Sequence, residues 1–290
     1  MNQYVLLTLA MLPPISILYY LLINDKKENN NTLVYQLFTL GLLLAVPIYY
    51  SEIFLIKNIF KESAFVNSFL VYSLIEEGAK FIVFIIAIET LKKNDLDTFK
   101  CILLATGVSL GIATSENIIY VLNYGAETAV LRALFAIPLH ACCGILMGYF
   151  LLRTSYFASF IIPFLIHGWY DFFILHPEVP SWIAFIFIGV IAYMCYETIN
   201  VVLKFHKSSF KKLKFISYSG LIKPGDGETH TINSFNDIFL GKLGIIIVLT
   251  FLIFLFFVTG LDEFTIGVLD NIRLKAIDLL GGSSNDFYRK

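Results

Sequence analysis

The chain has 290 residues, of which 58% are hydrophobic and only 15% are charged, and its mean hydropathy is +0.77. Soluble domains carry about 25% charged residues, so the composition excludes an ordinary soluble domain. The formal net charge is −1, which gives no basic excess for a nucleic-acid partner. The apolar residues lie in runs of about 20, the length that crosses a lipid bilayer as a helix. We therefore expect an all-α, polytopic membrane protein.

Eight apolar runs are predicted to be transmembrane helices. In chain order they cover residues 3–23, 33–56, 64–91, 99–123, 130–152, 157–175, 182–203 and 242–260. The first two make an N-terminal pair within 1–63, and the next five make a central transmembrane core of 64–203. A basic segment, 204–241, precedes the last helix and a polar tail in 242–290.

Lysine and arginine are unevenly distributed between the predicted loops. The loops after the even-numbered helices carry only Lys57, Lys61 and Arg132. The loops after the odd-numbered helices carry many more, among them the lysine-rich segment 204–241. Positively charged loops stay in the cytoplasm. We therefore predict a multi-pass plasma-membrane protein with both termini outside the cell, although the basic tail opposes this orientation.

Four consecutive predicted helices carry ionisable side chains well inside their apolar runs. An ionisable group at the bilayer centre costs at least roughly 2.5–3.5 kcal/mol on insertion scales, so each such residue is a candidate functional residue. The adjacent carboxylates of Glu76 and Glu77 also repel each other, and packing alone gives no reason for them. The full set is Glu76, Glu77 and Lys80 in the third helix, Glu116 in the fourth, His140 in the fifth, and His167 and Asp171 in the sixth.

Helical spacing predicts which of these side chains share a face. Lys80 follows Glu76 by four residues and Glu77 by three, so it can reach either carboxylate. Asp171 follows His167 by four residues, which lets its carboxylate hold one ring nitrogen and set the tautomer that the other presents. In the fourth helix, Tyr120 follows Glu116 by the same spacing, and Asn117 is adjacent to that glutamate.

The depth of these groups in the bilayer also agrees between helices. Measured from the predicted outer ends, Glu76, Glu116, His140 and His167 lie about 10 to 18 Å deep. All of them are therefore in the outer half of the membrane, although the helices alternate in direction. A common depth is what a single shared site requires.

Small residues are spaced so that the fourth and fifth helices can approach closely. Gly107, Gly111 and Ser115 form one such stripe, and Gly144 and Gly148 continue the face of His140. Stripes of this kind let helix backbones pack closely in lipid. We expect them to bring the two helices together beside their polar groups.

Two kinds of chemistry fit such a cluster. A buried carboxylate set among histidines can act as a general base toward water, while a histidine stabilises the developing oxyanion. Carboxylate and imidazole groups can instead hold zinc with an open position for water. No HExxH motif is present, so spacing alone does not decide between them. The candidate zinc ligands are Glu76 or Glu77, Glu116, His140 and His167, with Asp171 as the outer partner of His167.

The four cysteines all fall inside predicted helices. Buried small hydrophobic residues explain them better than a disulfide framework or a cysteine-rich zinc site. They are Cys101, Cys142, Cys143 and Cys195.

Four motifs, in order and one per helix, resemble those of the PrsW-type intramembrane proteases. Glu76-Glu77-Gly-Ala-Lys80 resembles the EExxK motif of that family. The other three are Gly111-Ile-Ala-Thr-Ser-Glu116-Asn117-Ile-Ile-Tyr120, Pro138-Leu-His140 with Gly144, and His167-Gly168-Trp-Tyr170-Asp171-Phe172. The resemblance covers about residues 64–175, and the rest of the chain carries no motif. The related CAAX-processing peptidases carry EExxxR and HxxxN motifs, from which this chain departs at Lys80, Glu116 and Asp171.

The resemblance implies a membrane-embedded peptidase that makes the first cut, near the extracytoplasmic face, in a single-span regulatory protein of the anti-sigma-factor type. It implies Glu76 or Glu77 as the base that activates water, with the other held by Lys80. Either a metal-dependent or a glutamate-dependent mechanism fits the family. The remaining roles are Glu116 and His140 as ligands or positioning groups, His167 with Asp171 as oxyanion donor or ligand, and Lys80, Asn117 and Tyr120 as supporting residues.

A proton-coupled transporter or channel is the alternative, because intramembrane carboxylates and histidines also build proton relays. Transporters of this kind usually show internal repeats around a midplane site. The sequence shows no repeat, and the polar groups lie away from the midplane. A non-catalytic scaffold with the same fold is a third, less favoured interpretation.

Overall fold

The computed structural model describes residues 2–25, 31–60, 63–91 and 96–208. Every regular element in these ranges is a helix, which confirms the all-α fold class. The predicted helix at 242–260, its polar tail and nearly all of the basic segment 204–241 lie outside the described residues.

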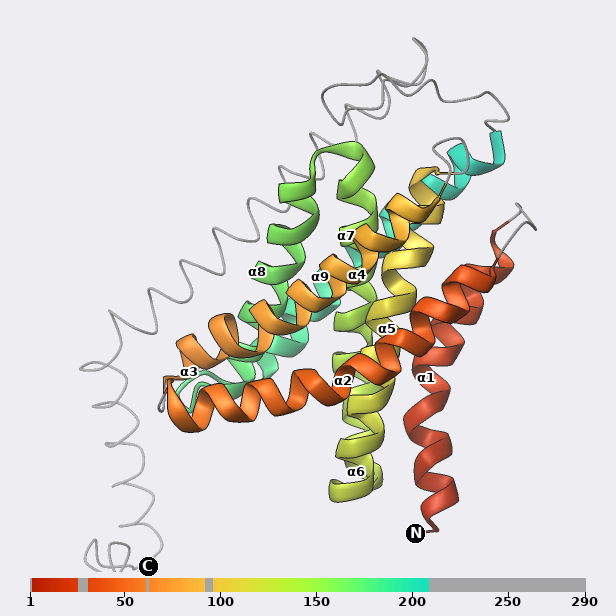
Figure 1. Ribbon diagram of the computed structural model, residues 1–290. Coiled ribbons are helices and arrows are strands. Elements are labelled where there is room, and N and C mark those ends of the chain that lie inside the picture. The colour runs from red at the N-terminus through yellow and green to blue at the C-terminus, as the bar shows by residue number, and fades with distance from the viewer. Residues whose placement is uncertain (1, 26–30, 61–62, 92–95, 209–290) are drawn as a thin grey trace, which may run out of the picture. The chain divides into compact units, whose positions relative to one another are not determined.

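The helices follow one another with short connections (Figure 1). Two of the predicted helices are continuous helical runs that contain a π-helical stretch. One run is α3 (Ala64–Val66), η1 (Asn67–Ser73) and α4 (Leu74–Thr90), and the other is α6 (Ala126–Leu131), η3 (Arg132–Ala136) and α7 (Ile137–Arg153). The others are α1 (Gln3–Ile23), α2 (Thr32–Asn58), α5 (Thr98–Tyr124), α8 (Tyr156–Leu175) and α9 (Trp182–Ser208).

Among the described residues, 6 helices are long and apolar enough to cross a membrane. They are α1, α2, α5, the run Ala126–Arg153, α8 and the Trp182–Lys204 part of α9, and each agrees with a predicted span to within a few residues. The predicted span at 64–91 is helical as expected. It is not among the six, because Glu76, Glu77 and Lys80 lie in the middle of the run and make it too polar. The count of eight spans is therefore supported only in part.

Local sequence explains where several helices begin and end. The Asp97 side chain accepts a hydrogen bond from the Lys100 backbone N–H (2.8 Å) at the start of α5. The Ser155 hydroxyl accepts one from the Ala158 N–H (3.1 Å) at the start of α8. Such side chains satisfy backbone donors that the first helical turn leaves free. At the other end of α5, Gly125 has a φ of 88°, a conformation that favours glycine and makes the turn into α6.

Helix α5 lies in the middle of the described helices and packs against α7, α2 and α1 (Figure 1). Gly144 and Gly148 of α7 contact α5 so closely that an added Cβ would meet the backbone of Thr106 and of Cys101. The expected close approach of these two helices is therefore confirmed on the α7 side. The α5 stripe faces elsewhere: an added Cβ at Gly111 would meet the carbonyl oxygen of Phe38 in α2.

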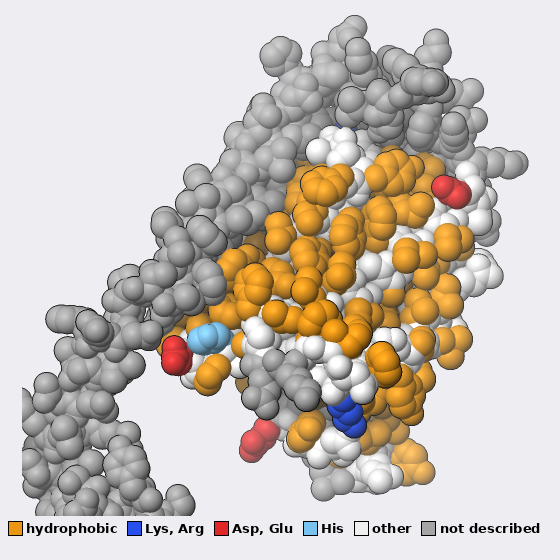
Figure 2. Space-filling model, turned by 60° about the vertical axis from the view of Figure 1, so that its left-hand side comes forward, with side chains coloured by type: hydrophobic (Ala, Val, Ile, Leu, Met, Phe, Trp, Pro, Cys, Tyr) orange, Lys and Arg blue, Asp and Glu red, His pale blue; other side chains and the backbone are white. Residues whose placement is uncertain are grey.

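The distribution of polarity is that of a protein in lipid. Figure 2 shows a face covered by hydrophobic side chains, with few charged ones. Large apolar side chains such as Tyr19, Leu43 and Phe157 are more than 60% exposed. Fully buried side chains, in contrast, include Lys80 and Glu77, at 0% exposure. An ionic interior beneath an apolar surface points to a functional site inside the helix bundle.

Candidate active site

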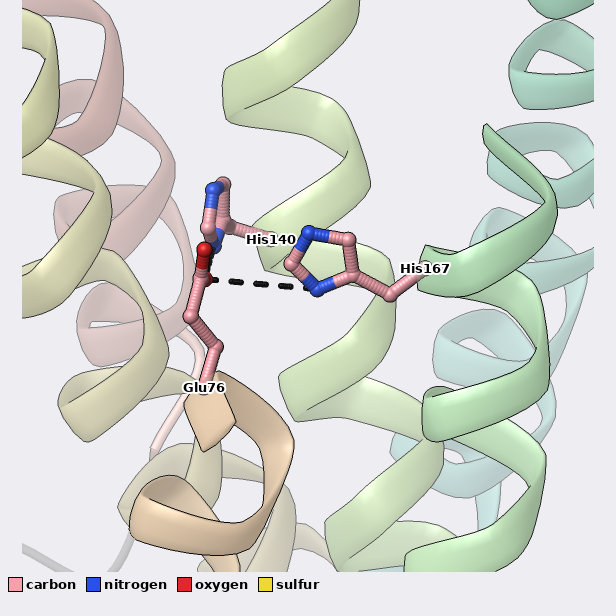
Figure 3. A group of neighbouring side chains, drawn as sticks. All are labelled: Glu76, His140 and His167. Atoms are coloured by element: carbon pink, nitrogen blue, oxygen red, sulfur yellow. Dashed lines mark ion pairs between the residues drawn. The ribbon is translucent and has the colours of Figure 1, made fainter. Parts of the chain in front are cut away.

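The ionisable side chains of three helices meet in the interior. Glu76, Glu77 and Lys80 come from α4, His140 from α7 and His167 from α8. All five are at most 6% exposed. Figure 3 shows Glu76 extending from its helix toward the imidazoles of His140 and His167. The two rings lie 5.3 Å apart, nearly perpendicular to each other.

Lys80 holds the two adjacent glutamates, as the helical spacing predicts. Its ammonium donates to Glu77 Oε1 (2.6 Å) and to Glu76 Oε2 (3.2 Å). The same Nζ lies 3.0 Å from His140 Nδ1. A buried charge is tolerated only when it is paired and hydrogen-bonded. One ammonium here offsets the repulsion between two neighbouring carboxylates and also contacts the imidazole of another helix.

Each imidazole presents one nitrogen to the centre and the other to an outer carboxylate. His167 Nδ1 is 2.7 Å from Glu77 Oε1, and its Nε2 is 3.3 Å from Asp171 Oδ2. His140 Nε2 is 3.3 Å from Glu116 Oε2, and its Nδ1 is 3.8 Å from Glu76 Oε2. Carboxylates in this outer position fix the orientation and tautomer of a histidine. Glu116 therefore lies behind His140, as Asp171 lies behind His167.

Arg132 organises the outer part of the site, a role that the sequence analysis missed. Its guanidinium donates to Glu116 Oε2 (3.1 Å) and to Asn117 Oδ1 (2.9 Å). It also stacks over the Tyr120 ring, 4.3 Å from its centre. One arginine thus joins the three residues of the Glu-Asn-x-x-Tyr motif. An arginine at the edge of an apolar run resembles an ordinary loop charge, so the sequence carried no signal for this contact.

Glu52 of α2 also belongs to this polar region. Its carboxyl group is near enough to those of Glu76, Glu116 and Asp171 to interact with them electrostatically. Its Oε1 is buried and has no hydrogen-bond partner among the described residues. Glu52 is not among the predicted site residues, although an acidic residue within an apolar run is the same signal that indicated the others.

Two sets of three donor groups are close enough to hold a metal ion. The first is Glu76, His140 and His167, and the second is Glu77, Cys143 and His167. In each set the donor atoms all lie within 4.8 Å of one another. The structure thus brings together Glu76 and the two histidines of the predicted zinc site. The other two predicted zinc ligands are not in the first set. Glu116 lies against the outer nitrogen of His140, and Glu77 belongs to the second set.

The first set fits a zinc ion of the catalytic kind. One carboxylate oxygen and two imidazole nitrogens leave a fourth position open, as in zinc hydrolases. Both histidines have the outer carboxylates that zinc-bound histidines usually have. Lys80 now hydrogen-bonds Glu76 Oε2 and contacts His140 Nδ1. A zinc ion between these side chains would contact Glu76 and His140 in place of the Lys80 ammonium.

The chain is a helical membrane protein whose buried glutamate–histidine cluster can hold a metal ion. This fold and site are those of a membrane-embedded hydrolase. Residues 29–197 match the model of a protein family described as "PrsW family intramembrane metalloprotease". The chain belongs to this family and is a peptidase.

Curated relatives named Protease PrsW agree with this assignment. The protein of Oceanobacillus iheyensis is 34% identical over 176 residues, which cover 58% of this chain and 81% of the relative. The Bacillus subtilis protein is 30% identical over 194 residues, which cover 63% and 88%. The Geobacillus kaustophilus protein is 31% identical over 186 residues, which cover 61% and 82%. No solved structure matches the chain significantly.

Proposed function

We propose that this peptidase hydrolyses a peptide bond of a single-span, membrane-anchored regulatory protein of the anti-sigma-factor type, near the extracytoplasmic face. The observation that carries the proposal is the buried cluster of Glu76, Glu77, Lys80, His140 and His167, which joins helices 60 to 90 residues apart in the chain. The motif resemblance supports the substrate class. The excess of lysine and arginine in the odd-numbered loops supports an orientation with both termini outside the cell.

In the proposed site Glu76, His140 and His167 would hold a zinc ion. Bound there, zinc would supply a Lewis acid for the scissile carbonyl and for water. Glu116 and Asp171 keep the outer nitrogens of the two histidines occupied, so that both rings present Nδ1 to the centre. Glu116 is thereby assigned as a positioning residue.

Glu77 is the proposed general base. Its Oε1 accepts a hydrogen bond from Lys80 (2.6 Å), whereas its Oε2 is buried without a hydrogen-bond partner among the described residues. A carboxylate anchored at one oxygen and free at the other is oriented to accept a proton from the attacking water. The same oxygen then returns this proton to the leaving amine. Lys80 keeps the carboxylate in place throughout.

Cleavage in cells tests this proposal. The chain is produced in a bacterium that lacks its own PrsW protease, together with epitope-tagged single-span anti-sigma factors, and fragments are followed by immunoblot. We expect Glu77→Gln to slow cleavage by about 10² to 10⁴, the usual contribution of a general base. We expect His167→Ala to abolish cleavage, and Glu127→Gln, a change at an exposed glutamate of α6, to leave it unchanged. Full cleavage by both site variants would refute the assignment.

Metal content decides between the two mechanisms. The purified full chain is compared with Glu76→Ala and His140→Ala by elemental analysis. We expect close to one zinc per chain in the unaltered protein and little in either variant. A metal-free protein whose cleavage ignores chelators would contradict the zinc site. It would leave a glutamate-activated water, with the histidines as oxyanion donors.

A further inference from the structure

We propose that Glu77, Cys143 and His167 form a second metal site, which takes a thiophilic divalent cation and inhibits the enzyme. One carboxylate, one thiol and one imidazole meet there from α4, α7 and α8, with donor atoms within 4.8 Å of one another. The three side chains are between 0 and 3% exposed. This site is distinct from the Glu76, His140 and His167 set, although it shares one histidine with it.

The donor types select the cation. Thiolate and imidazole ligands suit Zn²⁺ and its heavier analogue Cd²⁺, whereas Mg²⁺ and Ca²⁺ prefer oxygen ligands. The Cys143 thiol now makes a long contact, 3.8 Å, with the carbonyl oxygen of Pro163. Binding of the cation would release the thiol proton to solvent and replace this weak contact by a metal–sulfur bond.

An unpaired carboxylate oxygen independently marks the site. Glu77 is fully buried, and its Oε2 has no hydrogen-bond partner within the described ranges. Burying a charged oxygen without a partner is costly, so a cation beside it would be stabilising. Glu77 can bind through Oε2 while Oε1 keeps the ammonium of Lys80 at 2.6 Å. The site can therefore fill without breaking the contact of Glu77 with Lys80. The cation would take the place of the contact between His167 Nδ1 and Glu77 Oε1 (2.7 Å).

The two metal positions exclude each other because they share His167. Its Nε2 faces Asp171 at 3.3 Å, which leaves Nδ1 as the one nitrogen for a central ion. A cation bound to Glu77 and Cys143 takes Nδ1 away from the first set, and it also occupies the proposed base. Only this inhibition rests on the proposed function. The binding of the cation does not.

Cadmium binding to the purified, detergent-solubilised full chain tests the proposal, because a cadmium–thiolate bond gives an ultraviolet charge-transfer absorption. We expect this absorption to saturate at about one Cd²⁺ per chain and to disappear in Cys143→Ser. Cys142→Ser is the matched control: it changes the adjacent cysteine, which is also buried but belongs to neither donor set, and it should keep the absorption. Cys143→Ala repeats the test with an apolar replacement, and gel filtration shows that each variant is folded.

Inhibition is measured separately, as cleavage with and without excess Cd²⁺ relative to each variant's own metal-free rate. We expect at least tenfold inhibition of the unaltered chain and of Cys142→Ser, and less than twofold inhibition of Cys143→Ser. No absorption in the unaltered chain, or absorption that survives in both Cys143 variants, would overturn the site. Thiolate absorption in a chain that cleaves no substrate would uphold the site and count only against the proposed function.

Discussion

At the scale of single residues, the site is built from two histidines that are held in the same way. His167 and Asp171 lie on one helix, four residues apart, so sequence spacing predicts their contact. His140 and Glu116 make the equivalent contact between α7 and α5. The second pair cannot be recognised from spacing, because nothing in the sequence specifies which faces of two helices meet.

Arg132 is the residue whose replacement tests this outer layer. Its separate hydrogen bonds to Glu116 and to Asn117, and its stacking on Tyr120, need the planar guanidinium. We expect Arg132→Lys, which keeps the charge but not the geometry, to lower zinc affinity or cleavage about 10- to 100-fold, as loss of an outer partner does. Zinc affinity is measured by competition with a chromophoric chelator.

The same exchange at Arg153, the last residue of α7, provides the control for Arg132. Arg153→Lys should leave both quantities within twofold of the unaltered chain. If zinc affinity and cleavage were both normal in Arg132→Lys, the arginine would have no positioning role.

At the scale of helices, the π-helical stretches lie directly before the two helices that carry Glu76 and His140. The stretch η1 ends at Ser73, and η3 ends at Ala136. A π-helical turn holds one residue more than an α-helical turn, and this extra residue rotates the following helix about its axis. Such π-helical turns are frequent at functional sites. Both runs were predicted as helices. Their π-helical parts were not, because apolar periodicity does not distinguish a π turn from an α turn.

Close packing of α5 and α7 depends on glycine. We expect Gly148→Ala to lower the free energy of unfolding by about 1–3 kcal/mol, since its Cβ would collide with the backbone of Cys101. Unfolding in mixed detergent and denaturant micelles, followed by circular dichroism, measures the change. Gly189→Ala in α9 is the matched control, because nothing lies within 4 Å of its Cβ. Equal free energies of unfolding for the two variants would show that α5 and α7 accommodate the added Cβ without loss of stability.

At the scale of the whole molecule, the orientation in the membrane remains a prediction. We expect the α5–α6 turn and the α8–α9 connection to face outward, and the α7–α8 turn to face the cytoplasm. In intact cells a membrane-impermeant maleimide should label Glu127→Cys and Glu178→Cys but not Thr154→Cys. The unaltered chain is the blank, because its four free cysteines are all buried. Labelling of Thr154→Cys alone would reverse the orientation.

The sequence by itself determined the all-α class, the approximate ends of the described helices, and the buried glutamate, lysine and histidine residues at the centre of the polar cluster. These features are local: a helix in lipid satisfies its own backbone groups, and charges inside apolar runs are too costly to be incidental. The tertiary structure decided which groups meet. It paired His140 with Glu116, placed Arg132 over Tyr120, and set Cys143 beside Glu77.

The glycine stripe of α5 shows the physical reason for this division. Its spacing correctly predicts a close helix contact, yet the partner is α2, where the Ser115 hydroxyl donates to the Leu42 carbonyl (2.8 Å). A helix's own periodicity determines which residues share a face. The neighbour that covers that face follows from how all the helices pack together, because each contact depends on side chains distant in the chain.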